Sequence, residues 1–374
     1  EITTRLVGSE MCIRDRGGFG DTDITVLKHL NKVYDLTWFL IDEPNKNVNI
    51  SKDEAVDYAN ENSIKLIVCT RLFRVRSLKN LSFFMNIRNQ INKIGPDLIF
   101  TCMSEWGWML QVPMIKCKKI VYGIHDVKMH SYNKSFRLSL AWKLKILTTG
   151  LLYKYPCVFS KNQQKLYSDT YHKSIPNLGM SYKNFGSSLL KVSDISNGVK
   201  LLFFGSINIY KGLDLLIDAI EELYADGIKN VSLTIAGKGN AWNDCQKRIK
   251  HNDLFNLKIR FVDNAEIPDL FSTHHFLVLP YRDATQSGPL LTSLFYGLPI
   301  IAPNFGCFSD TYNEESAILY KQGSLKEAIY IASNITVDDY RVKVENCRKI
   351  RDTFSEENIA KKYIGYFNEL IENK

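Results

Sequence analysis

The sequence predicts an α/β protein made of two doubly wound, Rossmann-like domains, and three observations lead to this prediction. Short apolar runs rich in β-branched residues recur along the chain, separated by segments of helical length, as in parallel sheets. A polar stretch rich in Ser, Asn and Gly over 183–198 divides these runs into two series, which suits a linker. The 374 residues, of which 45% are hydrophobic, provide enough apolar material for two buried cores.

The first series extends over residues 17–182 and defines the first domain. A helix is expected at Thr25–Leu30. The strands expected after it are Leu36–Ile41, Lys65–Cys69, Asp97–Cys102, Lys119–Tyr122 and Cys157–Ser160. Each is a short apolar run of the kind that a parallel sheet buries on both faces.

The second series covers residues 199–355 and defines the second domain. Its expected strands are Lys200–Phe204, Val231–Ala236, Ile259–Val262, Phe276–Pro280 and Pro299–Ala302. Its expected helices are Leu213–Tyr224, Leu290–Tyr296 and Leu325–Ser333, and a last helix, Glu356–Glu372, closes the chain. Strands that alternate with helices in this way are typical of parallel, doubly wound sheets.

The first sixteen residues differ from the rest of the chain. They read EITTRLVGSEMCIRDR, and the string LVGSEMCIRD resembles the translation of a transposase sequencing adaptor. We expect that the natural gene does not encode residues 1–16; an ordinary N-terminal strand is the alternative. If Gly17–Gly20 is a strand-to-helix loop, the natural first strand is then missing from this sequence. Amplifying the source gene across this junction tests the expectation.

The composition excludes several classes of protein. Charged residues at 24% and aromatic residues at 12% exclude a disordered or collagen-like chain. The sequence has no run of 18 apolar residues, so no membrane-spanning helix is expected. The eight cysteines form no CxxC pair and no metal-like cluster, which indicates reduced thiols in a cytoplasmic protein. We expect neither a metal site nor a cofactor.

The net charge of +8 is shared unevenly between the two series. Residues 17–190 hold 24 Lys+Arg against 13 Asp+Glu, whereas residues 191–374 hold 21 against 24. Basic and apolar residues are interleaved at 70–80 and 135–155, which suits an anionic membrane surface. Solvated helix faces over a core are the alternative. No nucleic-acid-binding motif is visible, so nucleic acid is not an expected partner.

Three segments of the second domain favour a diphosphate site. In the first, FFGSINIYKG, a strand ends at Gly205 and Lys211 lies at the start of the next helix. Glycine lets a ligand approach the backbone closely, and a helix N-terminus with a lysine attracts phosphate. In the second, LTIAGKG, Gly237 follows another strand. Taken singly, an ordinary solvated lysine and a common glycine turn are the alternatives.

The third segment reads LPYRDATQSGPLLTSLFYGLPIIAP and begins at Leu279. Here Ser287, Gly288 and Pro289 start a helix, and proline is favoured in the first turn. Two helix N-termini at the carboxyl ends of parallel strands in one domain favour a nucleotide-diphosphate site.

The order of these three segments resembles the C-terminal domain of the GT-B glycosyltransferases of family 4, also called group 1. In the first domain, Gly17–Gly20, Tyr122–His130 (YGIHDVKMH) and Ile175–Asn177 are similar to looser features of that family. The resemblance implies two domains that face each other across a cleft, with the helix in 356–374 returning to the first domain. It also implies retaining, metal-independent transfer of a sugar from a nucleotide-activated donor.

The resemblance assigns roles to particular residues. Catalytic roles fall on Lys211, which matches the family lysine at the donor diphosphate, and on His125, which matches a histidine near the donor sugar. Gly17, Gly18 and Gly20 match the loop that faces donor and acceptor. The expected donor contacts are Gly205, Ser206, Lys211, Gly237, Ser287, Gly288, Pro289 and Thr292.

Three positions depart from the family pattern. Ser206 stands where many members have Arg, and Ala284 and Thr292 stand where the family has a pair of glutamates. Thr292 can hydrogen-bond a ribose, and Asp283 or Asp310 is a candidate for the missing carboxylate.

The histidines allow more than one interpretation. For His125, a helix-capping pair with Asp126 is the alternative to donor contact. A role for His130 stays open, and His274 and His275 are expected to be structural.

The expected function is glycosyl transfer to a glycan or lipid-linked acceptor, in the synthesis of surface polysaccharide or glycoconjugate. The expected location is the cytoplasm, including the inner face of the membrane as a peripheral protein. A sugar-nucleotide epimerase and a non-catalytic nucleotide-sugar-binding protein are the alternatives, the second because of the missing glutamates. The sequence does not identify the donor sugar, the base, the acceptor or the linkage.

Overall fold

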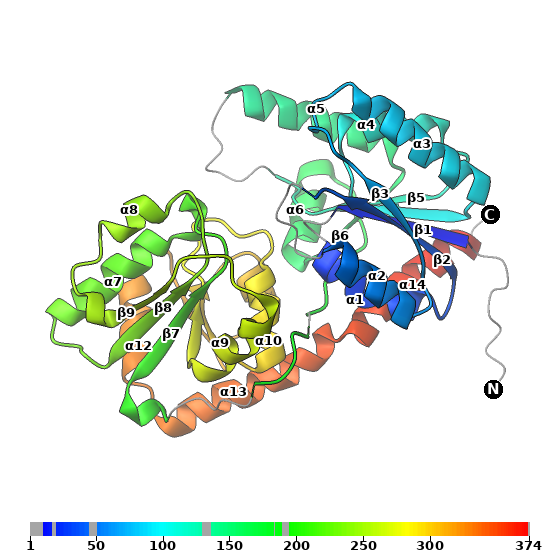
Figure 1. Cartoon of the computed structure of the whole chain (residues 1–374). Coiled ribbons are helices and arrows are strands. Elements are labelled where there is room, and N and C mark those ends of the chain that lie inside the picture. Colours follow the sequence, from blue (N-terminus) through cyan, green and yellow to red (C-terminus); the bar gives the residue numbers. More distant parts are fainter. Residues whose placement is uncertain are drawn as a thin grey trace, which may run out of the picture. The chain divides into compact units, whose positions relative to one another are not determined.

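The structure is a computed structural model that describes residues 10–16, 20–44, 51–128, 136–182, 184–188 and 194–372 (Figure 1). The chain forms two compact units, and each has a six-stranded parallel sheet. The first unit contains the described residues up to Ser181 together with 355–372, and the second contains the described part of 182–354.

The sheet of the first unit has the strand order β3-β2-β1-β4-β5-β6. Its strands are β1 (Glu10–Arg16), β2 (Asp35–Asp42), β3 (Lys65–Thr70), β4 (Leu98–Thr101), β5 (Ile120–Ile124) and β6 (Tyr155–Val158). Its helices are α1 (Gly20–Leu30), α2 (Lys52–Glu61), α3 (Lys79–Ile94), α4 (Trp106–Met109), α5 (Phe136–Leu152), α6 (Lys161–Tyr171) and α14 (Glu356–Glu372).

Strand β2 shows how the alternation of side chains builds two cores in this unit. Leu36, Trp38 and Leu40 point to one face and pack in a cluster with residues of α1, α2 and α14. Phe39 and Ile41 point to the other face and pack with residues of α3 and α4. Successive side chains of a strand point to opposite faces, so a strand that is apolar throughout serves both cores.

Helix α14 is the last described element and packs in the core of the first unit. Its apolar positions Ile359, Ala360, Tyr363 and Phe367 recur at helical spacing and are buried. The hydroxyl of Tyr34 donates a 2.6 Å hydrogen bond to Asn368 Oδ1 and fixes the helix further.

Strand β1 occupies the position where the sequence predicts a missing strand. Residues 10–16 pair in parallel with both β2 and β4. Their sequence, EMCIRDR, contains four charged residues, whereas central strands of parallel sheets are mostly continuous apolar runs. The origin of residues 1–16 therefore stays a prediction, which sequencing of the natural gene decides.

The sheet of the second unit has the order β12-β11-β10-β7-β8-β9. Its strands are β7 (Val199–Phe204), β8 (Val231–Ala236), β9 (Phe255–Lys258), β10 (Phe276–Val278), β11 (Ile300–Pro303) and β12 (Ala317–Tyr320). Its helices are α7 (Leu213–Ala225), α8 (Trp242–Gln246), α9 (Ile267–Thr273), α10 (Gly288–Tyr296), α11 (Cys307–Thr311), α12 (Leu325–Ser333) and α13 (Val337–Arg351). One cluster of buried residues joins α7 and α12 to the sheet.

The alternation of strands and helices in the sequence is confirmed in both units, although one strand was misplaced and β12 was not predicted. The sequence predicts a strand at Ile259–Val262, but the edge strand β9 is Phe255–Lys258. Phe255 pairs with Leu233 of β8, and this pairing ends at Lys258, opposite the end of β8. Edge strands are half exposed, so the polar residues of FNLK fit there although the run lacks an apolar pattern.

Candidate functional site

The loop after β7 places Lys211 close to the carboxyl end of the second sheet. Gly205 follows the strand with φ +115°, and a short 3-10 turn, Ile209–Lys211, leads to Gly212 at the start of α7. Gly212 has φ +68°, and a Cβ there would lie 2.0 Å from the carbonyl oxygen of Pro280. Only glycine fits this turn, which presses the Lys211 loop against the loop that follows β10.

Lys211 is a buried lysine without a counter-ion in its described surroundings. The residue is only 7% exposed, and this burial lowers the pKa of its ammonium below the ordinary value. Nζ donates a hydrogen bond of 2.7 Å to the Tyr281 hydroxyl and lies 4.6 Å from the centre of that ring. No described carboxylate forms an ion pair with it. Burying an unpaired charge is costly, so the site favours an anionic ligand.

The hydrogen bonds around Lys211 lead toward the start of α10. The Tyr281 hydroxyl accepts from Lys211, so its own proton is available to the Ser287 hydroxyl, 3.3 Å away. Ser287 precedes the first residue of α10, Gly288, and is buried. The ammonium, the Ser287 hydroxyl and the helix N-terminus thus form one set of donors for an anion.

The glycines and the proline expected at the donor site also meet here. A Cβ on Gly205 would lie 3.5 Å from Pro289 Cγ and 3.8 Å from Lys211 Nζ. A Cβ on Gly237 would lie 1.8 Å from the carbonyl oxygen of Gly205, which excludes any larger residue. All three segments that the sequence analysis singled out therefore converge. Ser206 is exposed and lies directly beside Gly205 in the chain.

An ion pair fastens the two loops of the site to each other. Arg282 donates from both terminal nitrogens to Asp214, at 2.7 and 2.6 Å, and also to the carbonyl oxygen of Ile209. Burial alone would raise the pKa of Asp214, but the hydrogen bonds and charge of Arg282 lower it. This fork-like pairing holds the loop after β10 against the turn that carries Lys211.

The two positions that lack the family's glutamates are closely packed. Ala284 is buried, and its carbonyl oxygen would lie 2.3 Å from a Cβ on Gly306. The Thr292 hydroxyl donates to the carbonyl oxygen of Gly288 within α10, at 3.1 Å. Nearby in the chain, both polar atoms of the Gln286 amide are buried and have no hydrogen-bond partner among the described residues. Gln286 is therefore a further polar candidate for ligand contact.

The family model of glycosyl transferases group 1 matches residues 198–335, which contain every site residue described above. The match is to residues 198–335 alone, and the second unit, which contains them, is called the group 1 domain below.

Curated relatives match about half of this chain, and one of them is uncharacterized. A 41.2 kDa protein of the cps region of Klebsiella pneumoniae is 23% identical over 171 residues, which cover 45% of this chain and 46% of that protein. The chain thus spans about half the length, or less, of the curated relatives that it matches. The resemblance to group 1 glycosyltransferases is confirmed, and it supports a glycosyltransferase.

Solved structures extend the similarity to the fold of both units. Sucrose-phosphate synthase of Thermosynechococcus elongatus has a TM-score of 0.73 at 14% identity, covering 98% of this chain and 100% of that one. Anabaena Alr3699/HepE, solved with UDP and glucose, has a TM-score of 0.71 at 14% identity, covering 96% and 99%. These matches confirm the α/β, GT-B fold class.

His125 belongs to the first unit and follows β5. Its ring lies 4.8 Å from that of Phe159, and burial lowers its pKa to about 4 despite the charge of Asp126. The imidazole is therefore neutral at neutral pH and suited to hydrogen bonding rather than proton donation. No helix begins at Asp126 within the described residues 125–128, so the capping alternative is not realised there.

Of the other predicted residues, three lie outside the part of the chain that the structure describes. Gly17, Gly18 and His130 lie outside the described residues, and Gly20 is the first residue of α1. In the group 1 domain, His274 hydrogen-bonds Leu270 O and Thr234 Oγ1, and the Lys200 amide donates to His275 Nδ1. The structural role expected of both residues is confirmed.

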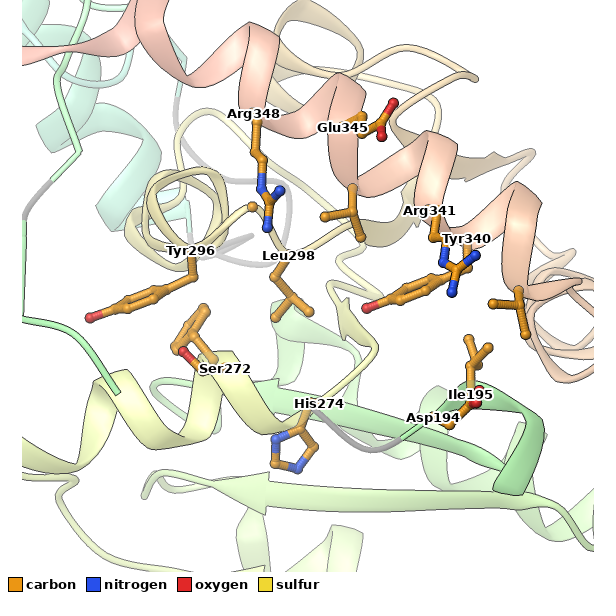
Figure 2. Close-up of a pocket in the computed structure, with 14 residues that line it drawn as sticks. Asp194, Ile195, Ser272, His274, Tyr296, Leu298, Tyr340, Arg341, Glu345 and Arg348 are labelled. Atoms are coloured by element: carbon orange, nitrogen blue, oxygen red, sulfur yellow. The ribbon is translucent and has the colours of Figure 1, made fainter. Parts of the chain in front are cut away.

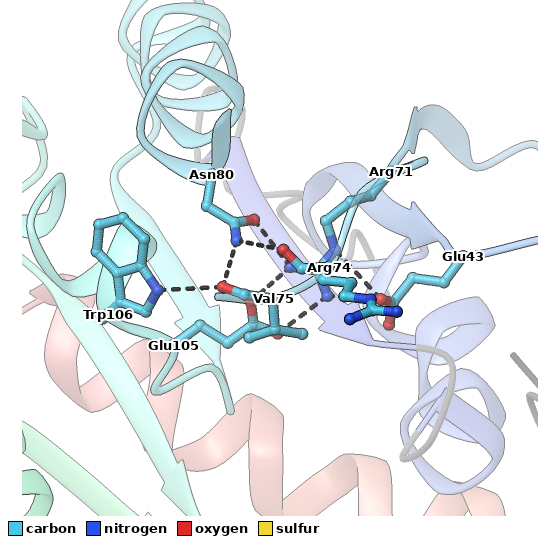
Figure 3. Close-up of polar contacts among 7 residues, drawn as sticks. All are labelled: Glu43, Arg71, Arg74, Val75, Asn80, Glu105 and Trp106. Carbon is cyan, nitrogen blue, oxygen red and sulfur yellow. Dashed lines mark hydrogen bonds and ion pairs between the residues drawn. The ribbon is translucent and has the colours of Figure 1, made fainter. Parts of the chain in front are cut away.

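One residue of the basic stretch 70–80, Arg71, differs from the prediction. Arg71 is fully buried and pairs with Glu43 and Glu105 at 2.7 and 2.5 Å (Figure 3). Trp106 and Asn80 hydrogen-bond the backbone of the same stretch. The expectation that Arg71 contributes to a basic membrane-facing surface is wrong, because two carboxylates neutralise a side chain that solvent does not reach.

A separate cavity of about 600 Å³ lies in the group 1 domain (Figure 2). Arg341 and Arg348 extend toward it from α13, and Tyr296 and His274 line it from other elements. None of the predicted donor contacts lines this cavity. It is therefore not the site built around Lys211.

Sequence reasoning missed Tyr281, Gln286 and the Arg282–Asp214 pair. Tyr281, Arg282 and Gln286 all stand in the quoted segment that begins at Leu279. The available signal was their position after a predicted strand, where parallel sheets place functional side chains. Their partners in the Lys211 loop are visible only in three dimensions.

Proposed function

We propose that this chain is a glycosyltransferase that takes a sugar from a nucleotide-diphosphate donor. The observation that carries the proposal is the buried Lys211 ammonium, which has no described carboxylate and lies beside Ser287 and the N-terminus of α10. A diphosphate supplies the missing negative charge. One of the three N–H bonds of the ammonium is used by Tyr281, so two are available to phosphate oxygens.

The same groups suit the transfer step. As the bond between sugar and diphosphate breaks, negative charge grows on the leaving diphosphate. Donors that are already in place stabilise that charge without rearrangement, and they act more strongly in a buried site. Lys211 and the start of α10 supply such donors, which is why we propose a reaction that does not depend on a metal ion. The resemblance to group 1 enzymes assigns the neutral His125 a hydrogen bond to the donor sugar.

The retaining outcome and the acceptor are further parts of this proposal. The retaining outcome follows from the resemblance to group 1 enzymes. A glycan or lipid-linked acceptor in surface polysaccharide or glycoconjugate synthesis is supported by the Klebsiella relative from a cps region. A peripheral place at the cytoplasmic membrane face is supported by the excess of basic residues in 17–190. No described helix is long and apolar enough to cross a membrane.

A donor panel tests the proposal directly. UDP-glucose is the first donor to test, because Alr3699/HepE was solved with UDP and glucose. We expect one nucleotide sugar to bind in the micromolar range and to be hydrolysed slowly or transferred, with the binding lost in Lys211→Met. Binding of every nucleotide sugar with equal affinity in Lys211→Met and in the parent protein would contradict the diphosphate site.

A second candidate function is nucleotide-sugar binding without turnover. Ala284 and Thr292 favour it, because neither provides the carboxylate that the family uses. In the glycosyltransferase that we propose, the buried amide of Gln286 replaces part of that contact. Gln286→Leu is then expected to weaken donor binding, whereas binding without any hydrolysis or transfer across a panel of acceptors would favour the second candidate.

A further inference from the structure

A large apolar groove lies in the first unit, apart from the Lys211 site. Its volume is about 940 Å³, and α5, α6 and the ends of β5 and β6 surround it (α5 and α6 are labelled in Figure 1). Apolar and aromatic side chains form most of its described lining, among them Ile146, Leu147, Tyr167 and Ile175. A groove of this size and character suits a hydrocarbon chain.

The charged residues at this groove all have the same sign. Lys128, Lys143, Lys154 and Lys173 belong to its described lining, and that lining contains no Asp or Glu. The sequence shows the same bias over a longer stretch, because residues 127–168 include eight Lys or Arg and no acidic residue. An occupant must therefore combine an apolar chain with an anionic head.

Exposed leucines extend the apolar surface from the lining of the groove to its outside. Leu144, Leu147 and Leu151 of α5 are 55%, 60% and 76% exposed. Their spacing of three and four residues places them on one side of the helix. Leu147 and Leu151 also line the groove, so the row runs along its rim. A small molecule enclosed in the groove would not require leucines as exposed as these, whereas a bilayer surface covers them.

We propose that α5 and α6 dock this chain on an anionic phospholipid bilayer. In this arrangement the leucine row enters the interface, the lysines bind lipid phosphates, and one acyl chain occupies the groove. The bilayer is then a partner of the first unit. This proposal rests on the proposed function only for the reason why the protein would contact a membrane. Arg71 plays no part, because Glu43 and Glu105 already pair with it.

Gly150 offers a matched pair of test variants. It lines the groove, and a Cβ at this position meets no atom within 4 Å. Glu and Lys are both better helix formers than Gly, so each variant is expected to fold. Gly150→Glu places a negative charge among the lysines, and Gly150→Lys adds a positive one.

A second variant tests the apolar row. Leu147→Glu combined with Leu151→Glu removes most of this row. Its control is Ile331→Glu on α12, because Ile331 is 56% exposed and lies in the other unit.

The experiment is co-sedimentation with vesicles of phosphatidylcholine, with or without about 30 mol% phosphatidylglycerol. We expect binding only to the anionic vesicles, weakened at least about tenfold when salt rises from about 0.05 to about 0.5 M. Gly150→Glu and the double leucine variant should lose most of it, and Gly150→Lys and Ile331→Glu should keep it. Circular dichroism confirms that all variants fold.

Several results would overturn the proposal. These are no binding by the parent protein, equal binding to neutral vesicles, or equal binding by Gly150→Glu and Gly150→Lys. Displacement by millimolar inorganic phosphate alone would show a phosphate site instead of a lipid surface, and preference for an isoprenoid diphosphate over phosphatidylglycerol would show an acceptor pocket. Vesicle binding is measured without donor, and donor binding without vesicles, so membrane docking and the proposed sugar transfer fail independently. Only the peripheral place at the membrane, proposed above, would fail together with docking.

Discussion

The ammonium of Lys211 donates a 2.7 Å hydrogen bond to the hydroxyl of Tyr281, a residue 70 positions further along the chain. This contact places a buried cation beside Ser287 at the start of α10, without a described carboxylate to balance it. The arrangement is unfavourable for an empty site and favourable for an anionic ligand. Folding stability and ligand binding are therefore expected to respond in opposite directions when this charge is removed.

The first prediction concerns Lys211→Met. Donor affinity should fall about 10- to 100-fold, since hydrogen bonds to charged groups contribute about 1.5–3 kcal/mol. The melting temperature of the free protein should stay the same or rise, because a buried unpaired charge is replaced by an apolar chain. Calorimetric titration and thermal unfolding measure the two effects. Lys238→Met is the control, since Lys238 is exposed and next to Gly237; a similar loss there would point to general electrostatics.

The second prediction concerns pH. Burial lowers the pKa of Lys211 below its ordinary value of 10.5, so the ammonium is lost at a lower pH than in the unfolded chain. Between the lowered value and 10.5 the unfolded state binds more protons, and the free energy of unfolding should therefore rise with pH. Donor affinity should fall over the same range, because the diphosphate needs the protonated form. Lys211→Met should show neither trend; identical pH profiles for both proteins would contradict the assignment.

The third prediction concerns the Arg282–Asp214 pair. Because it is partly buried and doubly hydrogen-bonded, a double-mutant cycle of Arg282→Met and Asp214→Asn should give a coupling of about 1–2 kcal/mol in unfolding. Each single variant should also raise the donor Kd, since the pair holds both loops of the site. The exposed pair Lys247–Asp244 is the control, and its coupling should be much smaller because solvent screens it. Equal couplings would contradict a positioning role.

The fourth prediction compares two glycines with positive φ. A Cβ on Gly237, at φ +152°, would lie 1.8 Å from Gly205 O, whereas a Cβ on Gly227, at φ +91°, meets nothing within 4 Å. Gly227→Ala should therefore cost only the backbone strain, about 1–3 kcal/mol. Gly237→Ala adds a clash with the backbone of the donor site and should also weaken donor binding. Equal destabilisation with unchanged donor affinity in both variants would contradict this packing.

The fifth prediction concerns His125 and His274. Burial lowers the pKa of each to about 4, so neither imidazole should take up a proton near pH 6.5. Between pH 6.5 and 4 the unfolded chain binds more protons at these residues, so the free energy of unfolding should fall as the pH is lowered. Nuclear magnetic resonance titration of the imidazole signals measures this. A midpoint near 6.5 for His125 would instead make it a candidate proton donor.

The patterns that sequence reasoning read correctly are local. The apolar runs of β7, β8 and β11 are visible because a strand buried on both faces must be apolar along its length. Gly205 and Gly237 were visible because loops after parallel strands need glycine where backbone segments approach closely. The α13 helix was missed, because its mostly polar sequence buries only Cys347.

The sequence by itself determined the two α/β units, the three segments of the proposed donor site and the uneven charge, since each depends on residues that are close in the chain. Only the tertiary structure decided which distant residues meet. It paired Lys211 with Tyr281, Arg282 with Asp214, and Arg71 with two carboxylates. These pairings depend on the strand order of each sheet and on how the loops at its edge pack together. A local sequence pattern does not reveal either of these. The same packing changed Arg71 from a predicted surface charge into a buried one.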